Sequence, residues 1–196
     1  IGWFQLAVVV IFGLLYAASP KTFAADVEFA PVPWALGIYF FFTIIRLALA
    51  YRGSVGPLVL YLSIVLDMCL LLGLIWGFHL QYERPPSFYL KSPTLLYVFI
   101  FIALRALRFE ARYVVAAGIV AALGWTGMAV YAVYSAGTEM VTRDYVYYMI
   151  HNAILIGAEF DKIISILLVT AIIAAAINRA RDLSRFFSPE IADQIT

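Results

Sequence analysis

Charged residues are scarce in this chain, and their scarcity indicates its class. Of the 196 residues, 13% are charged and 65% are hydrophobic, whereas a soluble domain of this size carries about 25% charged residues. The formal net charge of +1 gives no sign of a nucleic-acid partner. The single cysteine, Cys69, lies inside an apolar run and cannot form an internal disulfide. The composition therefore predicts an integral membrane protein.

Motifs that carry catalysis are also missing. The sequence has no glycine-rich phosphate loop, no Cys/His cluster at metal-binding spacing and no recognisable nucleophile–base pair. It shows no internal repeat of the kind found in transporters with two related halves. We therefore expect neither a catalytic site nor a metal site in this segment. Because the sequence begins at Ile1 rather than at a methionine, we also expect it to be part of a longer protein.

Long apolar runs are what the sequence has in abundance. A helix needs about 20 mostly apolar residues to cross a membrane, and six runs come near this length. They are Trp3–Ser19, Trp34–Ala50, Pro57–His79, Pro93–Leu107, Tyr113–Ser135 and Ala153–Ile177. We predict an all-α membrane protein in which residues 1–178 form a six-transmembrane-helix bundle and residues 179–196 form a cytoplasmic signalling helix. The first run could instead be a signal peptide, since Tyr16-Ala17-Ala18 resembles a cleavage site.

The distribution of lysine and arginine predicts how the helices are oriented. Alternate connections and the tail hold eight basic residues: Arg46, Arg52, Arg105, Arg108, Arg112, Arg179, Arg181 and Arg185. The other connections hold Lys21, Arg84, Lys91 and Arg143. Basic residues stay on the cytoplasmic side during insertion. Both ends of the chain are therefore predicted to be cytoplasmic.

Two charged residues lie near the middle of predicted spans, Asp67 in the third and Lys162 in the sixth. Charges inside a membrane are costly and usually face the interior of the bundle. A pair between Asp67 and Lys162 would neutralise both, so we predict this pair first. Arg46 and Arg105 are the alternative partners of Asp67. Such pairs either hold helices together or act as a switch that senses a ligand or the membrane potential.

The sixth run carries further charges close to Lys162. Glu159 lies three residues before Lys162, so both should occupy one helical face, whereas Asp161 should point elsewhere. A helix with charges on two faces is expected to contact several neighbours. The sixth helix is therefore predicted to be central in the bundle.

His79 and His151 both fall at the predicted outer ends of helices, among aromatic residues. Two such imidazoles could ligate a haem axially or line a quinone or small-ligand pocket. They could equally be interfacial residues with an apolar body and a solvated tip.

The arginines on the second and fourth runs, with Asp67 on the third, loosely resemble a voltage-sensor domain. A sensor helix carries several arginines three apart across the span, but Arg105 and Arg108 both lie at the cytoplasmic end. Anchoring by the positive-inside rule is the favoured interpretation. A transporter or channel-like module remains the alternative function.

The C-terminal tail has the pattern of a helical coupler. Leu183, Phe187, Ile191 and Ile195 recur every four residues, which predicts an amphipathic helix. Ser188 as an N-cap with Pro189 at the first helical position predicts that one helix ends there and another begins. The arginines of the tail would also suit a segment that lies on the membrane surface.

The sequence from Leu183 to Ala192, Leu-Ser-Arg-Phe-Phe-Ser-Pro-Glu-Ile-Ala, resembles the linker that precedes the catalytic domain of bacterial class III adenylate cyclases. The stretch from Glu159 to Ser165 and the six-helix anchor are also similar to membrane-bound cyclases of proteobacterial type. The resemblance implies a membrane anchor and receptor domain, in a bacterial inner membrane, for a downstream enzyme that makes cyclic AMP from ATP with Mg or Mn. It implies that Arg185, Phe187, Ser188 and Pro189 take part in coupling. Some relatives bind haem in such an anchor through several histidines, whereas this chain has two.

Because class III catalytic sites form between two chains, the resemblance also implies a parallel homodimer. Small residues let helices approach closely in lipid. They occur on the sixth run (Ala171, Ala174, Ala175 and Ala176) and on the fifth (Ala117, Gly118, Ala121, Ala122 and Gly124). We predict that the sixth helices lie near the two-fold axis, close to Ile173 and Ile177, with the fifth helix as the competing interface. Membrane lipids and an unknown lipophilic or redox ligand complete the expected partners.

Overall fold

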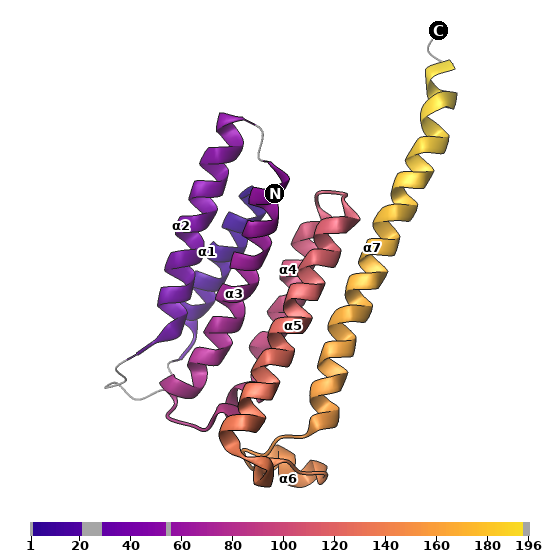
Figure 1. Ribbon diagram of the computed structural model, residues 1–196. Coiled ribbons are helices and arrows are strands. Elements are labelled where there is room, and N and C mark those ends of the chain that lie inside the picture. Colours follow the sequence, from indigo (N-terminus) through magenta and orange to yellow (C-terminus); the bar gives the residue numbers. More distant parts are fainter. Residues whose placement is uncertain (1, 21–28, 54–55, 194–196) are drawn as a thin grey trace.

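A computed structural model describes residues 2–20, 29–53 and 56–193, and this part of the chain is helical, without β-strands. The main helices are α1 (Gly2–Ala18), α2 (Pro31–Arg52), α3 (Pro57–Gln81), α4 (Tyr97–Ala106), α5 (Ala111–Ala136) and α7 (Ile156–Asp193). They run up and down along one axis, so that α1 begins and α7 ends at the same end of the bundle (Figure 1). The predicted all-α class is confirmed.

Short elements fill the opposite end of the bundle (Figure 1). Between α3 and α4 lie the 3-10 helices η1 (Pro86–Lys91) and η2 (Pro93–Leu96), and between α5 and α7 lie η3 (Thr138–Met140) and α6 (Tyr145–Ile150). Gly137 ends α5 with a φ of 78°, a conformation that glycine adopts without strain. We call the end of the bundle that holds η1, η2, η3 and α6 the α6 end, and we call the opposite end the termini end.

Within the described residues, four helices are long and apolar enough to cross a membrane: α2, α3, α5 and residues Ile156–Leu183 of α7. Gly2–Ala18 and Pro93–Ala106 are shorter apolar helices. Large apolar side chains such as Leu14, Leu123 and Leu168 are mostly exposed on the outside of the bundle. A hydrocarbon environment would cover this surface at no cost, whereas water would not. These features support a helical membrane protein.

The predicted fourth run, Pro93–Leu107, is only partly α-helical. The chain forms the 3-10 helices η1 and η2 before α4 begins at Tyr97. The side chain of Ser92 caps η2 by accepting a hydrogen bond from Thr94 N at 3.3 Å.

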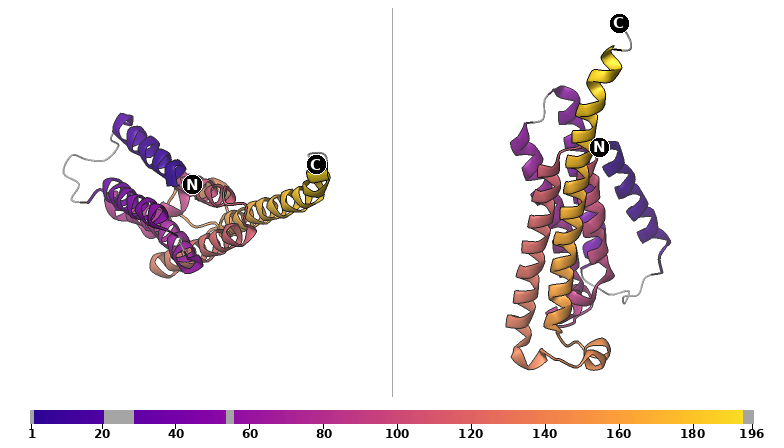
Figure 2. Two further views of the ribbon diagram at one scale, coloured as in Figure 1. Left: turned by 90° about the horizontal axis from the view of Figure 1, so that it is seen from above. Right: turned by 90° about the vertical axis from the view of Figure 1, so that its right-hand side faces the viewer.

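The break predicted at Ser188 and Pro189 is wrong, because α7 runs without interruption from Ile156 to Asp193. A proline inside a helix removes one backbone hydrogen bond, while the four-residue repeat of apolar positions favours a continuous helix. At 1.5 Å per residue the 38 residues of α7 extend about 57 Å. This is longer than the roughly 30 Å hydrocarbon core, and α7 projects beyond the other helices at the termini end (Figures 1 and 2).

Helix α5 lies at the centre of the packing and contacts α3, α4 and α7. Its glycines allow close approach: a Cβ atom at Gly118 would overlap the side chain of Thr170 on α7, and one at Gly124 would overlap Leu72 on α3. Ala117 and Ala121 are fully buried beside them. The small residues of α5 are thus occupied by contacts within the chain.

Candidate functional site

A buried carboxylate joins three helices. Asp67 on α3 is 1% exposed. Arg46 on α2 donates from Nη1 to both carboxylate oxygens, at 2.8 and 2.7 Å, and Arg105 on α4 donates to Oδ2. The predicted pair of Asp67 with Lys162 is therefore wrong, and both alternative partners are used. Equal depth did not make Asp67 and Lys162 neighbours, because α5 packs against both α3 and α7.

Polar side chains one helical turn away hold the arginine in place. Ser63 Oγ lies 2.5 Å from Arg46 Nη1, and Thr43 Oγ1 lies 3.2 Å from Nη2. The guanidinium also lies over the Tyr39 ring, 5.5 Å from its centroid. Sequence reasoning missed these residues. The signal was there, since Thr43 precedes Arg46 by three residues and Ser63 precedes Asp67 by four, which places each pair on one helical face.

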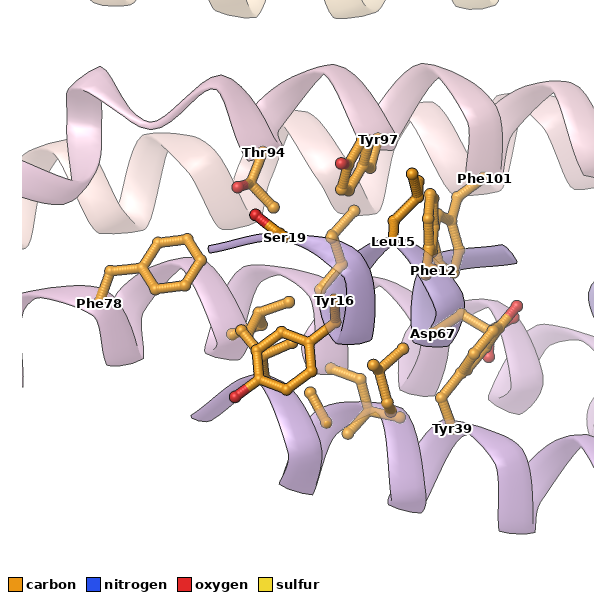
Figure 3. A pocket seen from close by; sticks show the side chains of 16 residues that line it. Phe12, Leu15, Tyr16, Ser19, Tyr39, Asp67, Phe78, Thr94, Tyr97 and Phe101 are labelled. Carbon is orange, nitrogen blue, oxygen red and sulfur yellow. The ribbon is translucent and has the colours of Figure 1, made fainter. Parts of the chain in front are cut away.

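Two cavities flank this cluster. One, of about 270 Å³, lies between α1, α2, α3 and the η2–α4 segment and is mostly apolar. Figure 3 shows Asp67 and Tyr39 at one end of this cavity and Phe78 at the other. The other cavity, of about 260 Å³, is lined by both arginines that bind Asp67. The ion cluster therefore separates an apolar cavity from a basic one.

A second buried carboxylate holds the start of α7. Glu159 is 3% exposed. Its Oε1 accepts a hydrogen bond from Lys162 Nζ at 2.7 Å, and its Oε2 accepts one from Trp125 Nε1 on α5 at 2.9 Å. Lys162 also donates to the Leu90 carbonyl of η1 at 2.5 Å. Asp161 is exposed on another face, as its spacing predicts. The start of α7 is thus tied to both α5 and η1.

Hydrogen bonds also fix the segments at the α6 end to the bundle. Lys91 donates to the carbonyls of Tyr148 and His151. Tyr89 donates to the Met128 carbonyl of α5 at 2.7 Å. Burial lowers the pKa of Lys91, with the nearby charge of Lys162 adding to the effect, and burial raises the pKa of Tyr89. Because Tyr89 binds α5 and the Leu90 carbonyl binds Lys162 of α7, a displacement of η1 would move both helices.

The two histidines have separate surroundings. His79 is buried, its Nδ1 contacts the Trp76 carbonyl, and its ring packs on Tyr89 with the centroids 5.6 Å apart. His151 is exposed and stacks on Tyr147 with the centroids 4.1 Å apart. No hydrogen bond or ring contact joins these two described side chains, and neither lines the cavities described above. A haem or quinone site that uses both histidines therefore stays a prediction.

A third cavity, of about 600 Å³, lies between α5 and the start of α7. Its walls are mainly apolar and include Val130, Val133, Phe160 and Ile163, and Glu159 also lines it.

In the part of the chain that the structure describes, no three His, Cys, Asp or Glu side chains form a group that could hold a metal ion. The side chains of Arg185, Phe187, Ser188 and Pro189 lie outside that part.

The network around Asp67 can be tested with double-mutant cycles. We expect Asp67→Asn and Arg105→Met to be coupled by about 0.6–1.7 kcal/mol, the range for polar contacts between membrane helices. Asp67→Asn and Lys162→Met should be additive within about 0.5 kcal/mol, because these residues are not in contact. Thermal unfolding in detergent measures both cycles. Coupling to Lys162 but not to Arg105 would contradict the structure.

In comparisons with known proteins, the chain matches no protein-family model, no curated protein and no solved structure. Its function is therefore inferred from the two buried ion clusters, the cavities beside them and the continuous helix α7.

Proposed function

We propose that this chain is the membrane anchor and regulatory receptor domain of an adenylate cyclase, with α7 as its output element. The observation that carries the proposal is the continuity of α7. One helix joins the buried Glu159 cluster to the tail that resembles a cyclase linker. A helix without a break passes a rotation or shift at one end to the other. The output is a dimeric cytoplasmic domain that makes cyclic AMP from ATP.

In this proposal all six main helices cross a bacterial inner membrane. The shorter segments, α1 and Pro93–Ala106, span it together with the four long helices. The excess of basic residues at the termini end supports a cytoplasmic position for that end. The α6 end, with η1 and α6, then faces the periplasm.

The ligand would be lipophilic and would occupy the 600 Å³ cavity between α5 and α7. A molecule in this cavity would contact both helices and Glu159. It would regulate the enzyme only if it bound one arrangement of α5 and α7 more tightly than another. Couplings of this kind are typically about 1–3 kcal/mol.

The dimer would be parallel and two-fold, with α7 near the axis. Supporting this, the outward face of α7 carries Leu168 and Ile172, exposed by 57% and 66%, beside the small exposed residue Ala175. Ile177 is buried and Ile173 is half-buried against the chain's own core. Ile173 and Ile177, which the sequence placed nearest the two-fold axis, face the chain's own core. We therefore place the neighbouring face, with Leu168 and Ile172, at the axis.

Cysteine crosslinking tests this interface. In a Cys69→Ser background, Leu168→Cys or Ile172→Cys should give disulfide-linked dimers in native membranes. Ile173→Cys and Ile177→Cys on the same helix are the matched controls and should give few. Efficient crosslinking at the two control positions alone would contradict the proposed face.

Insertion of two alanines after Arg181 tests the output through α7. The insertion rotates everything downstream by about 200°. In the full-length protein we expect basal cyclic AMP synthesis to change by about fivefold or more, with membrane insertion unaffected. A seven-residue helical insertion at the same place is the control, since it rotates the tail by only about 20°.

Three outcomes count against the proposal. Unchanged basal activity after the two-alanine insertion would make the six helices a passive anchor. Equal losses from both insertions would show that length, not orientation, matters. A full-length protein that makes no cyclic AMP would favour the transporter or channel-like alternative.

A further inference from the structure

The basic cavity of about 260 Å³ lies at the termini end of the bundle, between α1, α2, α3 and the end of α4. It is bounded by the first turns of α1 and α3 and the last turn of α2. Its polar lining consists of Gln5, Arg46, Ser63, Arg105 and Arg108. The part of the cavity near Gly2, Val59 and Arg108 lies within about one turn of the helix ends, at the depth of lipid headgroups when the helices cross a membrane, whereas Arg46 and Arg105 reach deeper to Asp67.

Three buried N–H groups on residues that line this cavity have no hydrogen-bond partner within the described part of the chain: Gln5 Nε2, Arg105 Nε and Arg108 Nε. The first two residues are 3% and 5% exposed. Arg108 Nε lies 3.9 Å from Glu110 Oε1, which is beyond hydrogen-bond distance. Buried donors without acceptors are rare because they cost free energy. Three of them on residues of one cavity show that this part of the bundle lacks a hydrogen-bond acceptor.

The charges around the cavity indicate that this acceptor is an anion. Three arginines line it, Arg46, Arg105 and Arg108, and the carboxylates nearest to them are Asp67 and Glu110. Asp67 is already shared by Arg46 and Arg105, and Glu110 lies 2.5 Å from Arg112 Nη2. Water would satisfy the N–H donors but would leave the excess positive charge uncompensated. An anion with several acceptor oxygens would satisfy both.

We propose that this cavity binds a phosphate group, carried either by an anionic phospholipid or by free phosphate. Arginine forms strong, directed hydrogen bonds with phosphate oxygens, and basic pockets between membrane helices on the cytoplasmic side bind anionic headgroups. The remaining walls are apolar and include Leu47, Leu49 and Leu60. The volume of about 260 Å³ equals that of roughly nine water molecules at about 30 Å³ each, which is ample for a phosphate group.

Thermal unfolding of the purified protein in an uncharged detergent tests the site at fixed ionic strength. Three probes are titrated separately: inorganic phosphate, phosphatidylglycerol and phosphatidylcholine. Stabilisation by phosphatidylglycerol alone supports a lipid headgroup as the ligand. Stabilisation by inorganic phosphate as well supports free phosphate. Equal stabilisation by phosphatidylcholine and phosphatidylglycerol, with none by phosphate, overturns the proposal.

Three variants separate the cavity from general surface charge. Gln5→Leu removes a donor without changing the charge, and Arg108→Gln removes one positive charge. Each should raise the probe concentration for half-maximal stabilisation about tenfold, the effect of losing one good hydrogen bond to a charged group. Arg52→Gln is the matched control, because Arg52 is exposed at the same end and does not line the cavity.

The variants also give the results that would overturn the site. The site would be overturned if Gln5→Leu and Arg108→Gln both needed the same probe concentration as wild type for half-maximal stabilisation. An equal loss in Arg52→Gln and Arg108→Gln, with none in Gln5→Leu, would show diffuse surface attraction instead. If Arg108→Gln does not fold, Gln5→Leu decides the question, since leucine is well tolerated in a membrane helix.

Discussion

A charged side chain inside an apolar helical bundle has to be neutralised and hydrogen-bonded, because the low-dielectric surroundings cannot solvate it. Two buried carboxylates meet this requirement here, and each joins three elements. Asp67 binds arginines of α2 and α4 to α3, while Glu159 joins α7 to α5 and, through Lys162, to η1. Moving a helix in either group would break at least one of these contacts. The clusters thus fix α2, α3 and α4 to one another, and α5, α7 and η1 to one another.

The two clusters give the two sides of the molecule different chemistry. Around Asp67 the arginines outnumber the carboxylate, so positive charge is left over beside a cavity at the termini end. Around Glu159 the one lysine is matched by the one carboxylate, and the adjoining cavity is apolar. Helix α5 lies between them, and its glycine at Gly118 lets α7 pack closely. A lipophilic signal at one side and an anion at the other would therefore act on one connected set of helices.

Local sequence determined much of this structure. Apolar runs bounded by Pro57 or Gly137 predicted the helices, and three-residue spacing predicted that Glu159 and Lys162 share a face. The partner of Asp67 was not predictable, because depth along a helix is local whereas the order of helices around the bundle is not. The capping pattern at Ser188 misled for a related reason: it describes one turn, and the helix on both sides of that turn outweighs it.

The central claim is that α7 carries a state set at Glu159 to a cyclase domain. Cyclic AMP synthesis by the full-length protein in membranes tests it most directly, with wild type compared with Glu159→Gln. Glutamine keeps an acceptor for Trp125 but loses the charge that holds Lys162. The account predicts equal expression and a change of about fivefold or more in basal synthesis. The same rate in both proteins, or no cyclic AMP from either, would contradict it.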